Sequence, residues 1–128
     1  MQQFIPLHQH LLVKAFITTP IDSEFRSKAF LRHIVREIGM KAVTNPQAAY
    51  VAELGNEGFT GSINLATSHI AFHCWDVTKL LMLDVYSCQV FKVGDVVKLI
   101  ELYFGETTDI HLVLFDRSTM KIMQEFRG

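Results

Sequence analysis

The pattern of hydrophobic and polar positions predicts alternating strands and helices. Residues 11–17 are rich in strand-forming side chains and stop at the breaker Thr18-Thr19-Pro20. Beyond it, apolar residues recur at helical spacing, with Asp22 or Ser23 as a cap and Gly39 as the terminator. We therefore expect a strand and then a helix whose inward positions are Phe25, Ala29, Phe30, Ile34, Val35 and Ile38.

The rest of the chain predicts mainly strands, with one more helix. The expected strands cover residues 48–52, 62–66, 69–75, 80–88 and 110–115. Asp95 is expected to cap the second helix, which ends at Gly105. Its inward positions are Val96, Val97, Ile100, Tyr103 and Phe104. Residues 118–128 fit either a final edge strand or a loose tail.

This order of elements predicts an α+β fold, a two-layer α/β sandwich with a mainly antiparallel sheet and two helices on one face. Two helices cannot cover both faces of a sheet of about six strands. The uncovered face then needs a partner, so we expect a homodimer assembled through it. The length of 128 residues fits one domain, 1–128, and an apolar fraction of 49% supplies its core.

Charge and composition exclude several classes of protein. Lys and Arg number 12 against 13 for Asp and Glu, so the chain lacks the basic excess of a nucleic-acid binder. Its longest apolar runs fall far short of the roughly 20 residues that cross a bilayer, and the amino end lacks the pattern of a secretory signal. We expect a cytoplasmic protein without nucleic-acid or membrane partners, in which Cys74 and Cys88 stay reduced.

Reactive side chains concentrate between positions 60 and 88, namely Thr60, Ser68, His69, His73, Cys74, Asp84 and Cys88. One possibility is a Cys–His hydrolase in which His69 or His73 activates Cys88, although no signature of such an enzyme surrounds the cysteines. A zinc site from His8, His10, His73 and the cysteines is another. The chain lacks the Cys-x-x-Cys and helical His-x-x-x-His spacings, so no metal is expected.

The central residues resemble the bacterial and archaeal S-adenosylmethionine decarboxylases in order and spacing. That family's pattern reads G-x-S-G, then E-S-H-I-x-x-H-T-W-P-E, then D-x-x-x-C, and the matching stretches here are residues 58–61, 67–77 and 84–88. The resemblance implies a pyruvoyl-dependent decarboxylase of polyamine (spermidine) biosynthesis. Its small-molecule substrate would be S-adenosylmethionine or a related amine.

The resemblance also implies roles for individual residues. Ser68 matches the serine at which the proenzyme cuts itself, attacking the carbonyl of Thr67 to form an ester that eliminates to a pyruvoyl group. This pyruvoyl group, the only cofactor implied, forms a Schiff base with the substrate and accepts electrons as carbon dioxide leaves. His73 matches the histidine that assists elimination, Thr60 a helping hydroxyl, and Cys88 the thiol that reprotonates the product. Regular strand alternation, however, predicts opposite faces for Ser68 and His73 unless the chain bends near Ser68.

Three departures from the family pattern leave alternatives open. Thr67 stands where the family has Glu, and the carboxylate that would hold the ribose hydroxyls is either absent or displaced by one residue, to Asp76. An aromatic residue for stacking on adenine is missing near Leu54, so Phe59 is the candidate substitute. The alternatives are a non-processing homologue that binds a small molecule or a protein, and a decarboxylase of a different amino acid.

Overall fold

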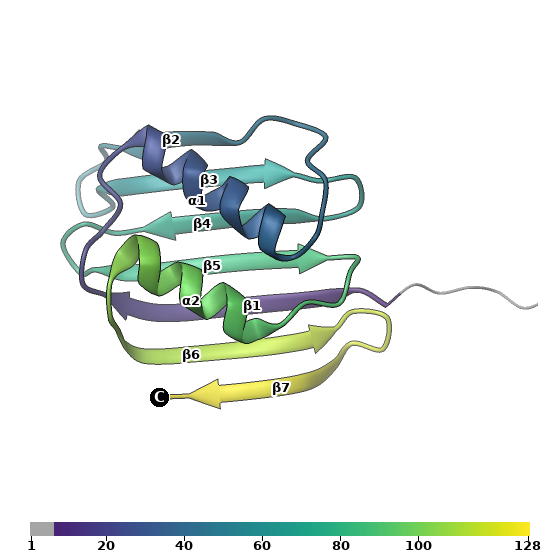
Figure 1. Ribbon diagram of the computed structural model, residues 1–128. Helices are drawn as coiled ribbons and strands as arrows, with labels where there is room; N and C mark the ends of the chain where they lie inside the picture. The colour runs from purple at the N-terminus through teal and green to yellow at the C-terminus, as the bar shows by residue number, and fades with distance from the viewer. Residues whose placement is uncertain (1–6) are drawn as a thin grey trace, which may run out of the picture.

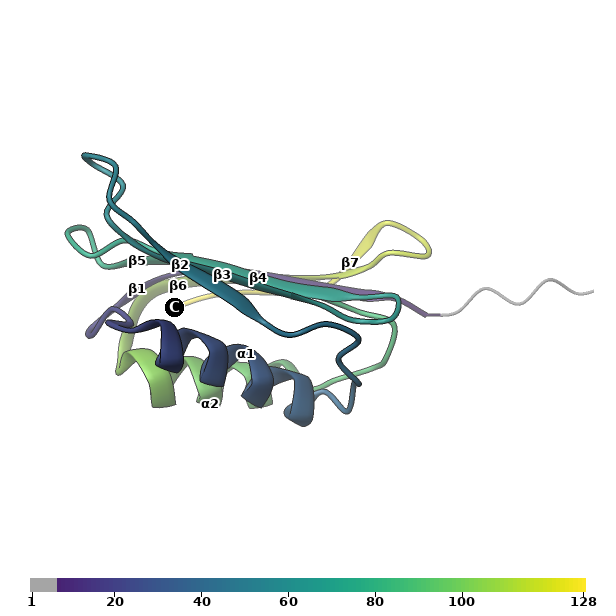
Figure 2. The same cartoon turned by 90° about the horizontal axis from the view of Figure 1, so that it is seen from above.

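The computed structural model describes residues 7–128 and has two layers, an antiparallel sheet and two helices (Figure 1). The elements are β1 (Gln9–Ile17), α1 (Glu24–Glu37), β2 (Gln47–Val51), β3 (Gly58–Asn64), β4 (His69–Cys74), β5 (Leu80–Ser87), α2 (Val93–Phe104), β6 (Thr107–Asp116) and β7 (Lys121–Arg127). Figure 2 shows both helices on the same side of the sheet. The predicted α+β sandwich with its helices on one face is confirmed.

The first strand lies inside the sheet instead of at its edge. The seven strands follow the order β2-β3-β4-β5-β1-β6-β7, so β1 pairs with β5 on one side and with β6 on the other. Helix α1 carries the chain from β1 to the far edge at β2, and consecutive hairpins then return it to β1 (Figure 1). This topology brings residues near position 10 beside residues near positions 85 and 115.

Alternate strand residues form the core beneath the two helices. On β1, the odd-numbered positions from Leu11 to Ile17 are buried. Phe30 of α1 lies within this core, edge-on to Phe72 and Phe104 with ring centroids 5.5 and 5.0 Å apart. The even-numbered positions of β1 point to the other face, which carries no helix and is called the open face below (Figure 2).

The helix ends confirm one predicted cap and contradict another. The Ser23 side chain accepts a hydrogen bond from the Arg26 N–H at 3.1 Å, so the predicted Ser23 cap is confirmed. The predicted Asp95 cap is wrong, because α2 begins at Val93, whose burial against the core extends the helix by a further turn. Among the described residues, neither helix is long and apolar enough to cross a membrane.

The inward position predicted for Phe25 is also wrong, since this side chain is 82% exposed. At about 100° per residue, Phe25 lies on the opposite side of α1 from Phe30. The buried stripe of α1 is Ser27, Phe30, Leu31, Ile34 and Val35.

Two strand predictions need adjustment. β3 begins at Gly58 instead of residue 62: residues 58–61 pair with β2, and Thr60 and Gly61 also pair with β4. A glycine is required at Gly61, where a Cβ would come within 2.7 Å of the Phe72 ring. The carboxyl-terminal segment forms the edge strand β7, the first of the two alternatives for it, and raises the number of strands to seven.

Candidate functional site

Ser68 and Cys88 meet at one corner of the sheet. Ser68 lies in the turn between β3 and β4, which is closed by a hydrogen bond from the Leu65 N–H to the Ser68 carbonyl at 2.9 Å. The Ser68 side chain is 7% exposed, and its Oγ accepts a hydrogen bond from the Cys88 N–H at 2.9 Å. Cys88 follows the end of β5, so the register of β4 and β5 brings the two residues together.

The two cysteine thiols differ in acidity. Side-chain hydrogen bonding from Thr67, with a smaller contribution from Ser68, lowers the pKa of the Cys88 thiol. Burial raises the pKa of Cys74 to about 11. Cys88 therefore has the more reactive thiol, and Cys74 is a core residue in keeping with its lack of a role in the family pattern.

Thr60 and His73 form a second pair, on the open face. They are direct partners across β3 and β4, with Thr60 Oγ1 2.7 Å from His73 Nδ1. The same hydroxyl oxygen lies 3.3 Å from the Phe72 carbonyl, so the Thr60 proton can be donated to either partner. The pair therefore offers a hydroxyl and an imidazole together on the open face.

One chain does not bring these two pairs together. Along β4, Ile70 and Phe72 are buried, whereas His69 and His73 are exposed on the open face. Ser68 is buried and His73 lies five residues further along, roughly 16 Å in an extended strand. Ser68 and His73 therefore lie on opposite faces of the sheet, as strand alternation predicted. β4 does not bend near Ser68 in a way that would bring the two side chains together.

Asp76 and Phe59 share a third location, a hollow of about 520 Å³ near the start of α1. Tyr50 lies between them: its hydroxyl donates to Asp76 Oδ2 at 2.8 Å, and its ring packs edge-on to Phe59 with centroids 5.3 Å apart. An aromatic pair beside a carboxylate can hold a planar ring together with hydroxyl groups. Sequence reasoning missed Tyr50, because the weak pattern of residues 41–54 gave it no distinguishing signal.

Comparison with known proteins identifies the family. The family model described as S-adenosylmethionine decarboxylase matches residues 9–118. The chain belongs to the S-adenosylmethionine decarboxylase family. An S-adenosylmethionine decarboxylase proenzyme from Archaeoglobus fulgidus is 31% identical over 85 residues, which cover 66% of this chain and 76% of the relative.

The fold agrees with a solved member of the family. The crystal structure of the adenosylmethionine decarboxylase from Aquifex aeolicus VF5 matches with a TM-score of 0.70 and covers 87% of this chain and 90% of that one. The sequence identity is 21%, so this likeness concerns the fold. All the candidate residues, from Phe59 to Cys88, fall within the segment that the family model matches. This chain is thus an S-adenosylmethionine decarboxylase-like protein.

Proposed function

We propose that this protein is a self-processing, pyruvoyl-dependent S-adenosylmethionine decarboxylase that acts in polyamine (spermidine) biosynthesis in the cytoplasm. The observation that carries the proposal is the meeting of Thr67, Ser68 and Cys88 at one corner of the sheet. The bond to be cut is Thr67-Ser68, and the thiol that the family pattern assigns to proton transfer lies beside it. The donor set of this corner thus fits a pyruvoyl group made from Ser68.

Each residue of the corner has a defined task in this proposal. The Ser68 hydroxyl attacks the Thr67 carbonyl carbon, the amide C–N bond breaks as the ester forms, and the hydroxyl proton ends on the freed Ser68 nitrogen. Removal of the Ser68 α-proton would then expel the Thr67 carboxylate, and hydrolysis by water would release the nitrogen as ammonia and leave the pyruvoyl group. The Cys88 N–H fixes the Ser68 oxygen, and the Cys88 thiol holds the proton for the product. When formed, the pyruvoyl group supplies an electron sink for decarboxylation.

The hollow near the start of α1 supports a nucleoside substrate. Asp76 offers a carboxylate to the ribose hydroxyls, and the Phe59 ring offers a surface for the adenine. Tyr50 orients the carboxylate by its hydrogen bond to Oδ2 and restricts the movement of Phe59. We assign substrate binding to these three residues.

The distance between Ser68 and His73 favours a homodimer. Within one chain the two residues lie on opposite faces, so the Thr60–His73 pair cannot assist at its own Ser68 without a bend in β4. The open face has a shallow hollow of about 450 Å³, with Leu12 41% and Met82 39% exposed. We propose that a second copy covers this face and that His73 of each copy assists at Ser68 of the other.

The intact mass of freshly purified protein tests self-processing. Cleavage gives fragments of 67 and 61 residues, the second beginning with the pyruvoyl group made from Ser68. The Ser68→Ala variant is expected to keep the full-length mass, whereas a Ser62→Ala control on the exposed part of β3 is expected to process normally. A full-length mass for the unmodified chain would exclude the pyruvoyl enzyme.

Coexpression of Ser68→Ala and His73→Ala chains, carrying distinguishable tags, tests the exchange between copies. Each variant alone is expected to process poorly. In the mixed dimer the His73→Ala chain keeps Ser68 and receives His73 from its partner, so this chain alone is cleaved. Failure of the mixture to restore cleavage, when the two variants form a mixed dimer, would show that His73 acts within its own chain.

A non-processing homologue is the second candidate, favoured by the burial of Ser68 and the engagement of its Oγ by the Cys88 N–H. It predicts one uncut chain that binds a nucleoside-like molecule or a protein. A decarboxylase of a different amino acid is the remaining alternative, favoured by the displaced carboxylate at Asp76. It predicts cleavage at Thr67-Ser68 but carbon dioxide release from a substrate that lacks the adenosyl group.

A further inference from the structure

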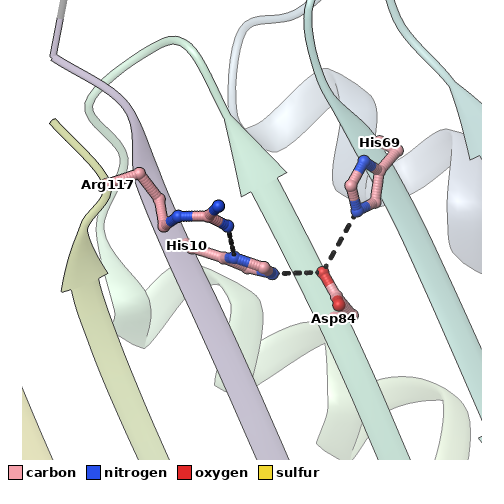
Figure 3. A network of polar contacts seen from close by, with 4 residues as sticks. All are labelled: His10, His69, Asp84 and Arg117. Carbon is pink, nitrogen blue, oxygen red and sulfur yellow. Dashed lines mark hydrogen bonds and ion pairs between the residues drawn. The ribbon is translucent and has the colours of Figure 1, made fainter. Parts of the chain in front are cut away.

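A cluster of metal-ligating side chains lies on the open face, and none of its members has a task in the proposed processing or substrate binding, although Asp84 also lines the open-face hollow. His10 of β1, His69 of β4 and Asp84 of β5 point toward one another (Figure 3). Strand register explains the meeting, because His10 and His69 both pair with Tyr86, and Asp84 lies two residues before Tyr86 on the same face of β5. The zinc set considered from the sequence included His10 but neither His69 nor Asp84.

The three side chains lie close enough together to reach one ion. Asp84 Oδ1 lies 2.6 Å from His10 Nε2 and 3.5 Å from His69 Nε2, and the three ligand atoms are all within 4.8 Å of one another. Tyr86 holds both rings, since it stacks on His69 with an interplanar angle of 14° and meets His10 edge-on at 87°. Two imidazoles and one carboxylate therefore converge from three adjacent strands.

We propose that His10 Nε2, His69 Nε2 and Asp84 Oδ1 bind a divalent transition metal ion of the zinc class. Imidazole nitrogen and carboxylate oxygen are ligands that zinc accepts, and three protein ligands leave one position for water or another small ligand. In a tetrahedral site, ligand atoms about 2.1 Å from the ion lie about 3.4 Å apart. The His69–Asp84 distance of 3.5 Å already meets this requirement, and the His10–Asp84 distance must open from 2.6 Å.

Arg117 controls access to the site. It comes from the turn between β6 and β7, which rises on the open side of the sheet in Figure 2, and its Nη1 lies 2.7 Å from His10 Nδ1 (Figure 3). A guanidinium group only donates, so His10 Nδ1 accepts, and the imidazole proton lies on Nε2, from which it is donated to Asp84. In the arrangement observed, a proton thus occupies the position that the metal would take.

Metal binding and the Arg117 hydrogen bond exclude each other. A metal ion on Nε2 moves the His10 proton to Nδ1, where it would face the N–H of Arg117. The positive charge of the guanidinium also repels the ion. Arg117 must therefore turn away when the metal binds, so the cluster has two states, a hydrogen-bonded one closed by Arg117 and a metal-bound one.

Titration of the purified protein, as it is after any self-cleavage, with Zn²⁺ and with Co²⁺ tests the site. Calorimetry is expected to give one equivalent, and the Co²⁺ complex is expected to lack a thiolate charge-transfer band, because no cysteine contributes. The His69→Ala and Asp84→Asn variants should each weaken binding by at least about tenfold. Arg117→Gln should tighten it by roughly three- to tenfold, since a competing positive charge is removed.

Two control variants define specificity. His33 also lies near one carboxylate, with its Nε2 3.8 Å from Glu37, so His33→Ala should leave the affinity within about twofold. Cys88→Ser should have no effect. Because His69 is on the surface, His69→Gln is expected to fold normally. An unchanged circular dichroism spectrum of this variant would show that its loss of metal binding does not come from misfolding.

The proposal is overturned if neither the unmodified protein nor Arg117→Gln binds one equivalent. It is equally overturned if binding persists in both His69→Ala and Asp84→Asn, or disappears in Cys88→Ser. None of the three ligands belongs to the residues assigned to self-processing or substrate binding. Because His69 directly follows Ser68, the intact mass of His69→Ala and Asp84→Asn is measured beside their metal affinity, and normal cleavage with weakened binding separates the two properties.

Discussion

The two faces of the sheet are made by alternate residues of the same strands, yet they carry different kinds of side chain. The covered face is apolar and packs against both helices, with rings such as Phe30, Phe72 and Phe104 at its centre. The open face carries polar pairs, Thr60 with His73 and His10 with Asp84, among partly exposed apolar residues. The Ser68–Cys88 corner combines a buried serine with candidate chemistry.

The residues that stabilise the fold and the residues available for chemistry therefore alternate along the same strands. They do not occupy separate segments of the chain. On β4, the buried Phe72 is followed by His73, and on β5 the buried Leu83 is followed by Asp84. Neighbouring residues can therefore be changed with distinct consequences. Variants on the covered face should lower the free energy of unfolding, and variants on the open face should alter assembly or ligand binding.

The largest effect is expected at the centre of the covered face. Phe30→Ala removes a fully buried ring that contacts three other rings, and should lower the free energy of unfolding by about 3–5 kcal/mol. Phe25→Ala on the same helix should change it by less than about 0.5 kcal/mol, because that ring is exposed. Urea unfolding of both variants measures the contrast, and equal losses would contradict the separation of the two faces.

The next largest effect is expected between the two cysteines, whose alkylation rates at pH 8 should differ by at least about a hundredfold. With a pKa of about 11, roughly 0.1% of Cys74 is thiolate at that pH, and burial also shields it. The lowered pKa of Cys88 makes a larger fraction of its thiol reactive. Peptide mapping after timed iodoacetamide treatment measures both rates, with Cys88→Ser as the control. Comparable labelling would show that the native core opens around Cys74.

The strands with clear alternation were predictable from the sequence. The expected segments 69–75 and 80–88 lie within one residue of β4 and β5 at each end, because each alternates between a buried and an exposed face. β7 could only be left open as a strand or a tail, since all seven of its residues are exposed and no periodic burial marks it. The exposure of Phe25 could not be predicted, because an apolar residue in the first turn of a helix fits the helical spacing whether or not it is buried.

Individual candidate residues could be predicted, but their grouping could not. The family pattern selected Ser68, His73 and Cys88, whereas the wide separation of Ser68 from His73 depends on an unbroken β4. The His10–His69–Asp84 cluster depends on β1 entering the sheet beside β5 and on the registers of two strand pairs. Neither a composition nor a spacing rule gives a register between strands about 60 or 70 residues apart.

Dimer formation through the open face should respond to a charge at its centre. Leu12→Lys replaces a partly exposed leucine of β1 with a charged side chain opposite Asp84 of β5, and should weaken association by about 2 kcal/mol, because the ammonium must lose its water when the second copy covers it. Analytical ultracentrifugation over a range of concentrations measures the dissociation constant. Lys121→Glu on β7, outside the lining of the open-face hollow, serves as a control. An unchanged dimer in Leu12→Lys would move the interface away from this face.

The smallest expected effect distinguishes the two helices of the covered face. α1 has the side-chain cap Ser23, whereas Lys92 at the corresponding position of α2 has an extended backbone and no side-chain cap. Lys92→Asp provides an acceptor for a free N–H of the first turn and a negative charge at the positive end of the helix dipole. It should raise the free energy of unfolding by about 0.5–1 kcal/mol, and Ser23→Ala should lower it by about 1 kcal/mol. Urea unfolding measures both. Destabilisation by Lys92→Asp would mean that the lysine stem packs on α2 and contributes more than a cap can replace.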